Sequence, residues 1–222
     1  MEFTDGYGRS IDTPASMDGK LARQPLSLRE ALVPSQTFPH ITVVRDWALL
    51  AHIGRLRYTQ YVEAQQKLYQ SAVLQPNCLL EHADFTGVNI CGLQEGQLTA
   101  AMRINVLMDS TVPASAVLLP VAGELGIERD RTLICTRLVR AIEHSGSHAA
   151  DLIRFVRQQT VTAGYRYCLM QTAPRLVRYF TRFEFTATDV WTDDQAAGRL
   201  NVMLLDTRMQ ATQHRKNFDV AA

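Results

Sequence analysis

The sequence predicts an α/β domain of the α+β type, built on a mixed, largely antiparallel sheet flanked by helices. Apolar residues make up 46% of the 222 residues, enough for a sizeable core. Strand-like and helix-like apolar periods alternate over residues 41–207, the expected folded domain. Residues 1–40 and 208–222 lack such periods, so we expect a flexible arm and a tail. A short helix is expected inside the arm, between Leu21 and Val33.

The first elements of the domain are expected to be a short strand and a long helix. Residues 41–44 predict the strand, and Asp46 can cap the helix because its carboxylate accepts from amides of the first turn. The helix would continue over residues 58–69 after a bend. Its apolar residues recur at helical spacing, and they are Trp47, Leu50, Ile53 and Leu56.

A hairpin is the clearest signal in the middle of the chain. Glu95-Gly96 separates two apolar runs within residues 87–106, as in a tight turn between strands. Residues 107–131, which contain prolines and glycines, are expected to be irregular. The remaining expected elements are a strand at 132–142, a helix at 148–163, a strand at 166–172, a helix at 174–182 and two strands at 183–189 and 199–206.

Two arginines, Arg103 and Arg137, lie in apolar strands. A buried arginine is costly unless a carboxylate pairs with it. Glu81 and Asp84, at the mouth of the expected sheet, are placed to supply those carboxylates. The four residues could therefore form a functional network, or they could serve only to hold the shape of the sheet.

The order of these residues resembles that of the acyl-homoserine-lactone synthases and the related N-acyl amino acid synthases. The resemblance covers about residues 47–189 and implies a GNAT-like fold, in which two central strands splay apart. A tyrosine replaces the phenylalanine of the family's Arg-x-x-x-Phe motif. The residues that carry the resemblance are Arg57, Tyr61, Glu81, Asp84, Arg103 and Arg137.

The resemblance implies an N-acyltransferase that moves a fatty acyl group from acyl carrier protein to the α-amine of an amino acid or a related small amine. Glu81 and Asp84 would orient the amine while Arg103 and Arg137 hold the network, and these four are the predicted catalytic residues. The co-substrate would be the acyl-phosphopantetheine thioester of the carrier protein, or acyl-CoA, with no permanently bound cofactor. Arg57 and Tyr61 are assigned to the substrate site by the motif, although packing is the alternative for Tyr61.

Acyl transfer also requires donors for the oxyanion that develops on the thioester carbonyl. The backbone amides of Val139, Arg140 and Ala141 are predicted to supply them, and the loop Ser145-Gly146-Ser147 is predicted to bind the phosphate of the donor. The glycines that CoA-dependent GNAT enzymes carry here are absent, which fits a carrier-protein donor.

Arginines predict a surface for the acidic carrier protein. No aspartate or glutamate occurs between Leu152 and Phe183, and like charges one turn apart are unfavourable on a helix. A solvated helix face is the alternative. The predicted partner-binding residues are Arg154, Arg157, Arg175, Arg178 and Arg182.

Two positions depart from the family. Its glutamate before the strand arginine falls on Ile134, which disfavours lactone synthesis, and its tryptophan after the first helix is missing where Lys67 to Tyr69 lie. Glu63 and His144 could be bases, although solvated roles are the simpler interpretation. An acyl-homoserine-lactone synthase and a catalytically silent acyl- or protein-binding module therefore remain alternatives.

Composition argues against several other classes of protein. A net charge of +1 gives no general attraction to nucleic acid. We expect a cytoplasmic protein, because no apolar run is long enough to span a membrane and no signal peptide is evident. The four cysteines lack metal-site spacing, so neither a metal nor a disulfide is expected. The sequence does not indicate an oligomeric state.

Overall fold

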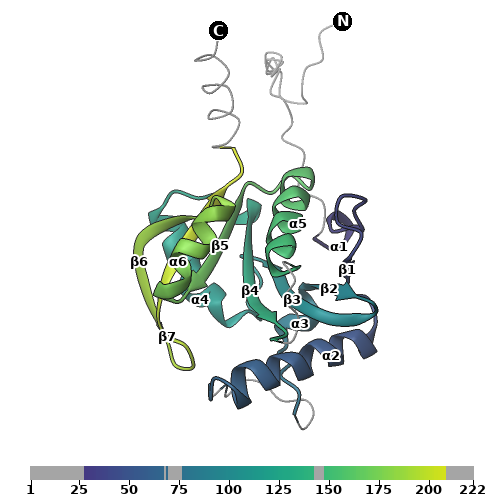
Figure 1. Cartoon of the computed structure of the whole chain (residues 1–222). Coiled ribbons are helices and arrows are strands. Elements are labelled where there is room, and N and C mark those ends of the chain that lie inside the picture. Colours follow the sequence, from purple (N-terminus) through teal and green to yellow (C-terminus); the bar gives the residue numbers. More distant parts are fainter. Residues whose placement is uncertain (1–27, 68, 70–76, 143–147, 209–222) are drawn as a thin grey trace, which may run out of the picture.

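A seven-stranded sheet forms the centre of the molecule in the computed structural model, which describes residues 28–67, 69, 77–142 and 148–208 (Figure 1). The strands lie in the order β1-β2-β3-β4-β5-β7-β6, and only β4 and β5 run parallel. The mixed, largely antiparallel sheet predicted from the sequence is thus confirmed. The strands are β1 (Ile41–Val43), β2 (Val88–Gln94), β3 (Gln97–Val106), β4 (Thr132–Arg140), β5 (Tyr167–Thr172), β6 (Thr186–Asp194) and β7 (Gly198–Asp206).

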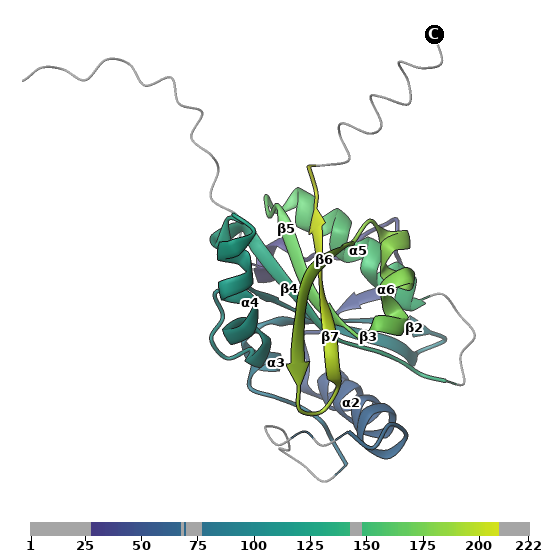
Figure 2. The same cartoon turned by 90° about the vertical axis from the view of Figure 1, so that its left-hand side faces the viewer.

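Helices cover both faces of this sheet (Figure 2). On one face the apolar core includes residues of α1, α5 and α6, and on the other it includes residues of α2, α3 and α4. The helices are α1 (Leu28–Ala31), α2 (Trp47–Arg57), the π-helical η1 (Tyr58–Glu63), α3 (Ala83–Thr86), α4 (Pro113–Glu124), η2 (Arg129–Arg131), α5 (His148–Thr162), α6 (Pro174–Phe180) and η3 (Thr181–Phe183).

The start of α2 follows the predicted capping. The Asp46 carboxylate accepts a hydrogen bond from the Leu49 amide at 2.8 Å. Leu50 and Ile53 are buried, whereas Trp47, expected on the same apolar face, is 48% exposed because it stacks on Phe85 at the surface. The expectation that the helix continues over residues 58–69 is only partly met: α2 passes into the wider π-helix η1, which ends at Glu63, and Gln66 beyond it has a left-handed φ of 51° that no α-helix continues through.

The expectation of irregular structure over residues 107–131 is wrong, because α4 lies there. Pro113 is the first residue of this helix. A backbone N–H at that position would have no partner within the helix, so a proline is well tolerated there. Leu118, Val121 and Ala122 then pack against the sheet. The free energy gained by burying this apolar face outweighs the cost of Pro120, which lacks a backbone N–H for the helix.

Part of the expected arm belongs to the core. Leu28, Ala31 and Leu32 are buried against α5 and the sheet. Residues 1–27 of the arm and residues 209–222 of the tail lie outside the described residues. All four cysteines are buried free thiols.

Candidate functional site

The parallel strands β4 and β5 pair over only part of their length. Thr132–Ile134 pair with Tyr167–Leu169, but β4 continues to Arg140 and β5 to Thr172 without further pairing. We call the unpaired part, residues 135–140 of β4 and 170–172 of β5, the β4–β5 opening. It corresponds to the splayed strands that the sequence predicts.

A β-bulge shapes β4 along this opening. Val139 pairs with Ala101 and Thr136 with Arg103, so that Arg137 and Leu138 both oppose Met102. Arg137 has a left-handed backbone conformation, with φ of 56°. An extra residue bends and twists a strand and re-aims its side chains and amides. A left-handed non-glycine residue is unfavourable and persists only where surrounding contacts impose it.

The side chain of Arg137 belongs to an ion-pair network. Arg103 and Arg137 both bond the Glu81 carboxylate, with Arg103 Nη1 at 2.7 Å from Oε2 and Arg137 Nη2 at 2.5 Å from Oε1. Arg137 Nε makes a second bond to Glu81, at 2.9 Å. Arg57 Nη1 bonds Asp84 Oδ1 at 2.7 Å, and Arg103 also lies 3.3 Å from Asp84. The predicted pairing of the strand arginines with these two acids is confirmed.

Burial distinguishes one member of the network from the rest. The side chains of Arg57, Glu81, Asp84 and Arg103 are at most 3% exposed, whereas that of Arg137 is 19% exposed. Arg137 is therefore the most exposed side chain of the network. Arg57, predicted in the substrate site, is buried between Asp84 and Asn89.

The arginines control the ionisation of both acids. Burial by itself would raise the pKa of Glu81, but the bonds from Arg137 and Arg103 outweigh it and lower the pKa to about 2. The pKa of Asp84 is also lowered, because Arg57 and Arg103 outweigh its burial. A carboxylate that is ionised and fully bonded is a poor base, so both acids are placed to fix the arginines.

Two polar residues of the network were not predicted from the sequence. Asn89 accepts from Arg57 at 2.9 Å and donates to the backbone carbonyl of Asp84 at 3.0 Å, and Thr136 accepts from Arg103 Nε at 3.1 Å. A buried asparagine inside the apolar run of β2 was the available signal, since such a residue requires hydrogen-bond partners.

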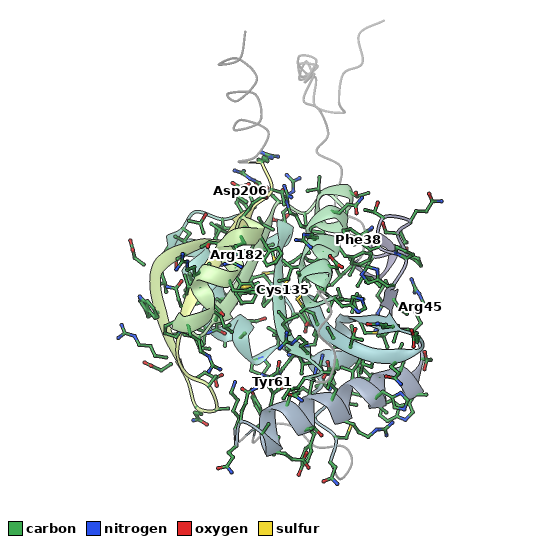
Figure 3. The ribbon with its side chains drawn as sticks, viewed as in Figure 1. Phe38, Arg45, Tyr61, Cys135, Arg182 and Asp206 are labelled. Carbon is green, nitrogen blue, oxygen red and sulfur yellow. The ribbon has the colours of Figure 1, made fainter. Side chains whose placement is uncertain are left out.

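Tyr61 connects the end of α2 to the bulge. Its hydroxyl donates to the Leu138 carbonyl at 2.5 Å, and its ring packs against Tyr69. Figure 3 labels Tyr61 beside helix α2. Burial raises the pKa of Tyr61 to about 12, so the hydroxyl stays protonated at neutral pH. The bond to the strand goes beyond the packing role considered for this residue.

Two of the three predicted oxyanion donors, the amides of Val139 and Ala141, require correction. The Ala141 amide is not available, because it donates to the Thr99 carbonyl at 2.8 Å and continues the ladder with β3. Val139 belongs to the same ladder, opposite Ala101. Backbone groups alternate in direction along a strand, so the Arg140 amide points away from β3 and toward the opening. Ser145, Gly146, Ser147 and His144 lie outside the described residues.

The predicted docking arginines divide into two groups. Arg154 pairs with Asp151 at 2.8 Å, and Arg157 pairs with Glu184 at 2.8 Å. These two acids lie just outside the acid-free stretch from Leu152 to Phe183 and compensate the charges of both arginines. Arg175, Arg178 and Arg182 form no ion pair with any described carboxylate. The predicted docking arginines without an ion-pair partner among the described residues therefore lie on α6 and η3.

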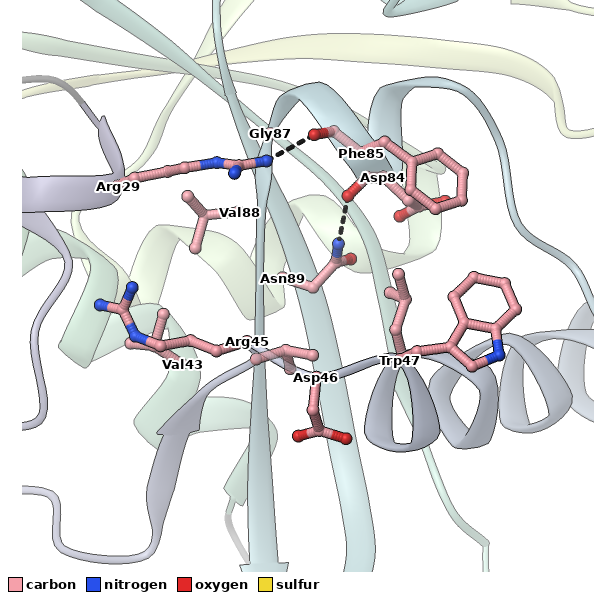
Figure 4. A pocket seen from close by; sticks show the side chains of 12 residues that line it. Arg29, Val43, Arg45, Asp46, Trp47, Asp84, Phe85, Gly87, Val88 and Asn89 are labelled. Atoms are coloured by element: carbon pink, nitrogen blue, oxygen red, sulfur yellow. Dashed lines mark hydrogen bonds between the residues drawn. The ribbon is translucent and has the colours of Figure 1, made fainter.

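A cavity of about 330 Å³ lies beside the edge strand β1 (Figure 4). It is bounded by the edge strand β1, the start of α2 and α3, and Trp47 and Phe85 stack at its rim with rings 6.2 Å apart. Asp84 and Asn89 line it, so it borders the back of the network.

The remaining candidates contribute little to the site. Ile134 packs among apolar residues beside Leu169, so no acid occupies the position of the family's glutamate. Glu63 is exposed at the end of η1. Within the described ranges, no group of three or more histidine, cysteine or acidic residues could hold a metal ion. The same ranges contain no helix of the length and apolarity needed to cross a membrane.

Comparison with solved structures defines the class of fold as GNAT-like. The chain resembles the CoA-dependent acyl-homoserine lactone synthase BjaI, solved with SAM and isopentyl-CoA, with a TM-score of 0.59 and 17% identity over 73% of this chain and 77% of that one. It also resembles the AHL synthase LasI, with a TM-score of 0.61 and 13% identity over 76% and 91% of the two chains.

A third similar structure is FeeM, an N-acyl amino acid synthase from uncultured soil microbes, with a TM-score of 0.59 and 14% identity over 75% and 90% of the chains. No protein-family model and no curated protein matches this chain. At these identities the comparisons establish the fold, and the predicted GNAT-like architecture is confirmed.

Proposed function

We propose that the protein is an N-acyltransferase that transfers a fatty acyl group from a thioester to the amine of a small acceptor. The observation that carries this proposal is the β4–β5 opening with the bulge beside it. Backbone that no neighbouring strand pairs with offers amides to a thioester, and the partly exposed Arg137 belongs to the bulge in the same stretch of β4. The solved structures of similar fold are N-acyl amino acid and acyl-homoserine lactone synthases, which supports this reaction class.

The acyl thioester would lie in the opening with its carbonyl toward the amides of β4. The amine nitrogen attacks the carbonyl carbon and forms the C–N bond, and the C–S bond breaks to release a thiolate that takes up a proton. The Arg140 amide points toward the opening and is the predicted oxyanion donor with the clearest geometry. The N-terminus of α5, a helix of 15 residues, follows β4 and suits the phosphate of the donor.

Glu81 and Asp84 would act through the arginines. Both carboxylates are buried and fully bonded, so we propose that they hold Arg103 and Arg137 in place, and that Arg137 contacts the acceptor. Because the pKa of Glu81 is about 2, water in the opening is a better route for the amine proton than this carboxylate.

Acyl carrier protein is the donor that we favour over acyl-CoA. The uncompensated arginines Arg175, Arg178 and Arg182 present positive charge to an acidic protein, and such complementarity speeds association. Either thioester occurs in the cytoplasm, in keeping with the location expected from the sequence.

The test is a thiol-release assay coupled to mass spectrometry. Purified protein is incubated with decanoyl carrier protein or decanoyl-CoA and a panel of amines. We expect release of free thiol together with an amine that has gained the mass of one acyl group. Intact thioesters and unmodified amines with both donors would instead favour a catalytically silent binding module.

A further inference from the structure

We propose that Lys67 binds a carboxylate of the acceptor, so that the enzyme selects amines that carry a carboxylate, such as amino acids, over their amides. This inference rests on the proposed acyl transfer. The resemblance to known families gives Lys67 no role, and the inference makes it the residue that recognises the acceptor carboxylate.

Lys67 lies directly beside the bulge contact. Its backbone amide donates to the Tyr61 carbonyl at 2.9 Å, and its ammonium lies 5.2 Å from the centre of the Tyr61 ring. The hydroxyl of the same tyrosine bonds Leu138 in the bulge. Lys67 is thus held at the edge of the β4–β5 opening by the residue that contacts β4.

A second cation–aromatic pair lies next to the first. Arg137 lies 4.3 Å from the centre of the Tyr69 ring, and the rings of Tyr61 and Tyr69 are 6.1 Å apart. Two cations and two tyrosines therefore gather at one end of the opening. Such a combination suits a small anion with apolar substituents.

The two cations differ in what already compensates them. Arg137 is bonded to both oxygens of Glu81. Half-buried Lys67 has no carboxylate of the described residues within ion-pair distance. Burial, followed by the charge of Arg137, lowers the pKa of Lys67, and Arg175 acts in the same direction. An incoming carboxylate would relieve this unfavourable arrangement of charge.

The nearby acid of the β6–β7 turn has other partners. Asp194 acts on Lys67 from a distance and raises its pKa, but its Oδ1 accepts from the amides of Ala196 and Ala197 at 2.8 and 2.7 Å. It is therefore committed to the turn between the two strands.

Lys67 is not positioned to bind the phosphate of the donor. Lys67 and Tyr61 lie on the α2 face of the sheet, where Tyr61 packs with Ile53 and Val139. The N-terminus of α5, which suits the phosphate, belongs to the other face, where Ile153 and Phe155 enter the core. The donor phosphate and the acceptor carboxylate would thus be bound on opposite faces.

The experiment compares amino acids with their primary amides, which keep the amine and side chain but lose the negative charge. Wild type, Lys67→Met, Lys67→Arg and the control Arg55→Met are assayed for acyl transfer to L-leucine, L-tyrosine, L-glutamine and the three matching amides. Arg55 is an exposed cation on α2. The Tm of each variant is also measured with each compound in the absence of donor, a readout that requires no turnover.

For wild type we expect KM for the favoured acid to be at least about tenfold below that for its amide, because a charged hydrogen bond is lost with the carboxylate. Lys67→Met should raise KM for the acid about tenfold and leave the amide nearly unchanged, with kcat little affected. Lys67→Arg should recover most of the preference, and Arg55→Met should behave as wild type.

Three results would overturn the inference while leaving acyl transfer in place. They are equal use of acids and amides by wild type, equal losses for both in Lys67→Met, and an unchanged acid preference in that variant. If no amine is acylated at all, the proposed function fails. The inference then depends on the Tm shifts, and the absence of an acid-specific, Lys67-dependent shift would reject it.

Discussion

At the scale of single residues, the charged side chains behind β4 behave as one unit because each acid is shared by two arginines. Glu81 bonds Arg103 and Arg137, and Asp84 bonds Arg57 and lies beside Arg103. Burying such charges is costly unless every group is bonded, which is the case for both carboxylates. The arrangement leaves one guanidinium, that of Arg137, partly exposed.

Tyr61 offers a single-atom test of how the bulge is held. Tyr61→Phe removes the hydroxyl and leaves the partly buried Leu138 carbonyl without that donor. We expect a loss of about 1–3 kcal/mol in the free energy of unfolding, measured by urea denaturation. In the proposed reaction, kcat should fall several-fold while KM for the acceptor changes little, because the bulge aims the amides of β4.

The matched control for this variant is Tyr58→Phe on the same helical segment. Among the described residues, the Tyr58 hydroxyl has no hydrogen-bond partner, so its removal should change stability by less than about 0.5 kcal/mol. Similar losses in the two variants would show that the Tyr61 hydroxyl does not hold the strand.

At the scale of elements, what could be predicted follows from local signals. The hairpin of β2 and β3 was evident from Glu95-Gly96, whose residues both have positive φ, as a tight hairpin turn requires. The cap at Asp46 and the amphipathic α5 were evident for similar reasons. These features depend on neighbours in the chain.

Features that depend on distant residues could not be predicted. The bulge residue Arg137 is bonded by Glu81, which is remote in sequence, so no local pattern indicates it. α4 was missed because Pro120 argues locally against a helix, and only the sheet beneath Leu118 and Val121 makes it favourable. Charge in apolar strands identified Arg103 and Arg137 and their acidic partners, and the family motif identified Arg57. Neither signal identified Asn89 or Thr136.

Pro120 makes a testable prediction about α4. It is exposed and lies inside the helix, where its ring removes a backbone hydrogen bond. Pro120→Ala should therefore raise the free energy of unfolding by about 1–3 kcal/mol, measured by urea denaturation. Pro113→Ala is the control, since proline is well tolerated at the start of a helix. A gain of the same size at Pro113, or no gain at Pro120, would contradict this account of the helix.

At the scale of the whole molecule, charge is distributed unevenly although the net charge is only +1. The acids of α5 and of the segment after η3 pair with Arg154 and Arg157, whereas the arginines of α6 and η3 have no such partners among the described residues. Net charge therefore gives no indication of the surface on which an acidic partner would bind.

The corresponding prediction concerns docking of the carrier protein. Arg178→Glu combined with Arg182→Glu should raise KM for acyl carrier protein about tenfold or more at low salt and leave kcat and Tm nearly unchanged. The effect should shrink as salt rises, because exposed charges are screened beyond about 10 Å at 0.1 M. The charge-matched control is Arg45→Glu with Arg55→Glu, at exposed positions on and before α2. Equal effects of the two double variants, or none from the first, would remove α6 and η3 from the docking surface.

The buried acids also predict how stability depends on pH. The pKa of Glu81 is lowered to about 2 from 4.5, and that of Asp84 is lowered from 3.8. Lowered pKa values mean that the unfolded chain binds protons that the folded protein does not. The resulting stabilisation is complete above the unfolded pKa values and is lost as the pH falls from about 5 toward 2.

Urea unfolding at a series of pH values measures this loss. For Glu81 alone, the shift corresponds to a loss of roughly 3 kcal/mol between pH 5 and pH 2. Glu81→Gln should be less stable than wild type at pH 7, because Arg103 and Arg137 lose a charged partner. Its stability should nevertheless decline less steeply below pH 5, since the titrating group is gone. Glu63→Gln, at an exposed acid, should keep the wild-type slope. If Glu81→Gln declined as steeply as wild type, the carboxylate would not be ionised in the network, and the arrangement that holds Arg137 at the opening would need another explanation.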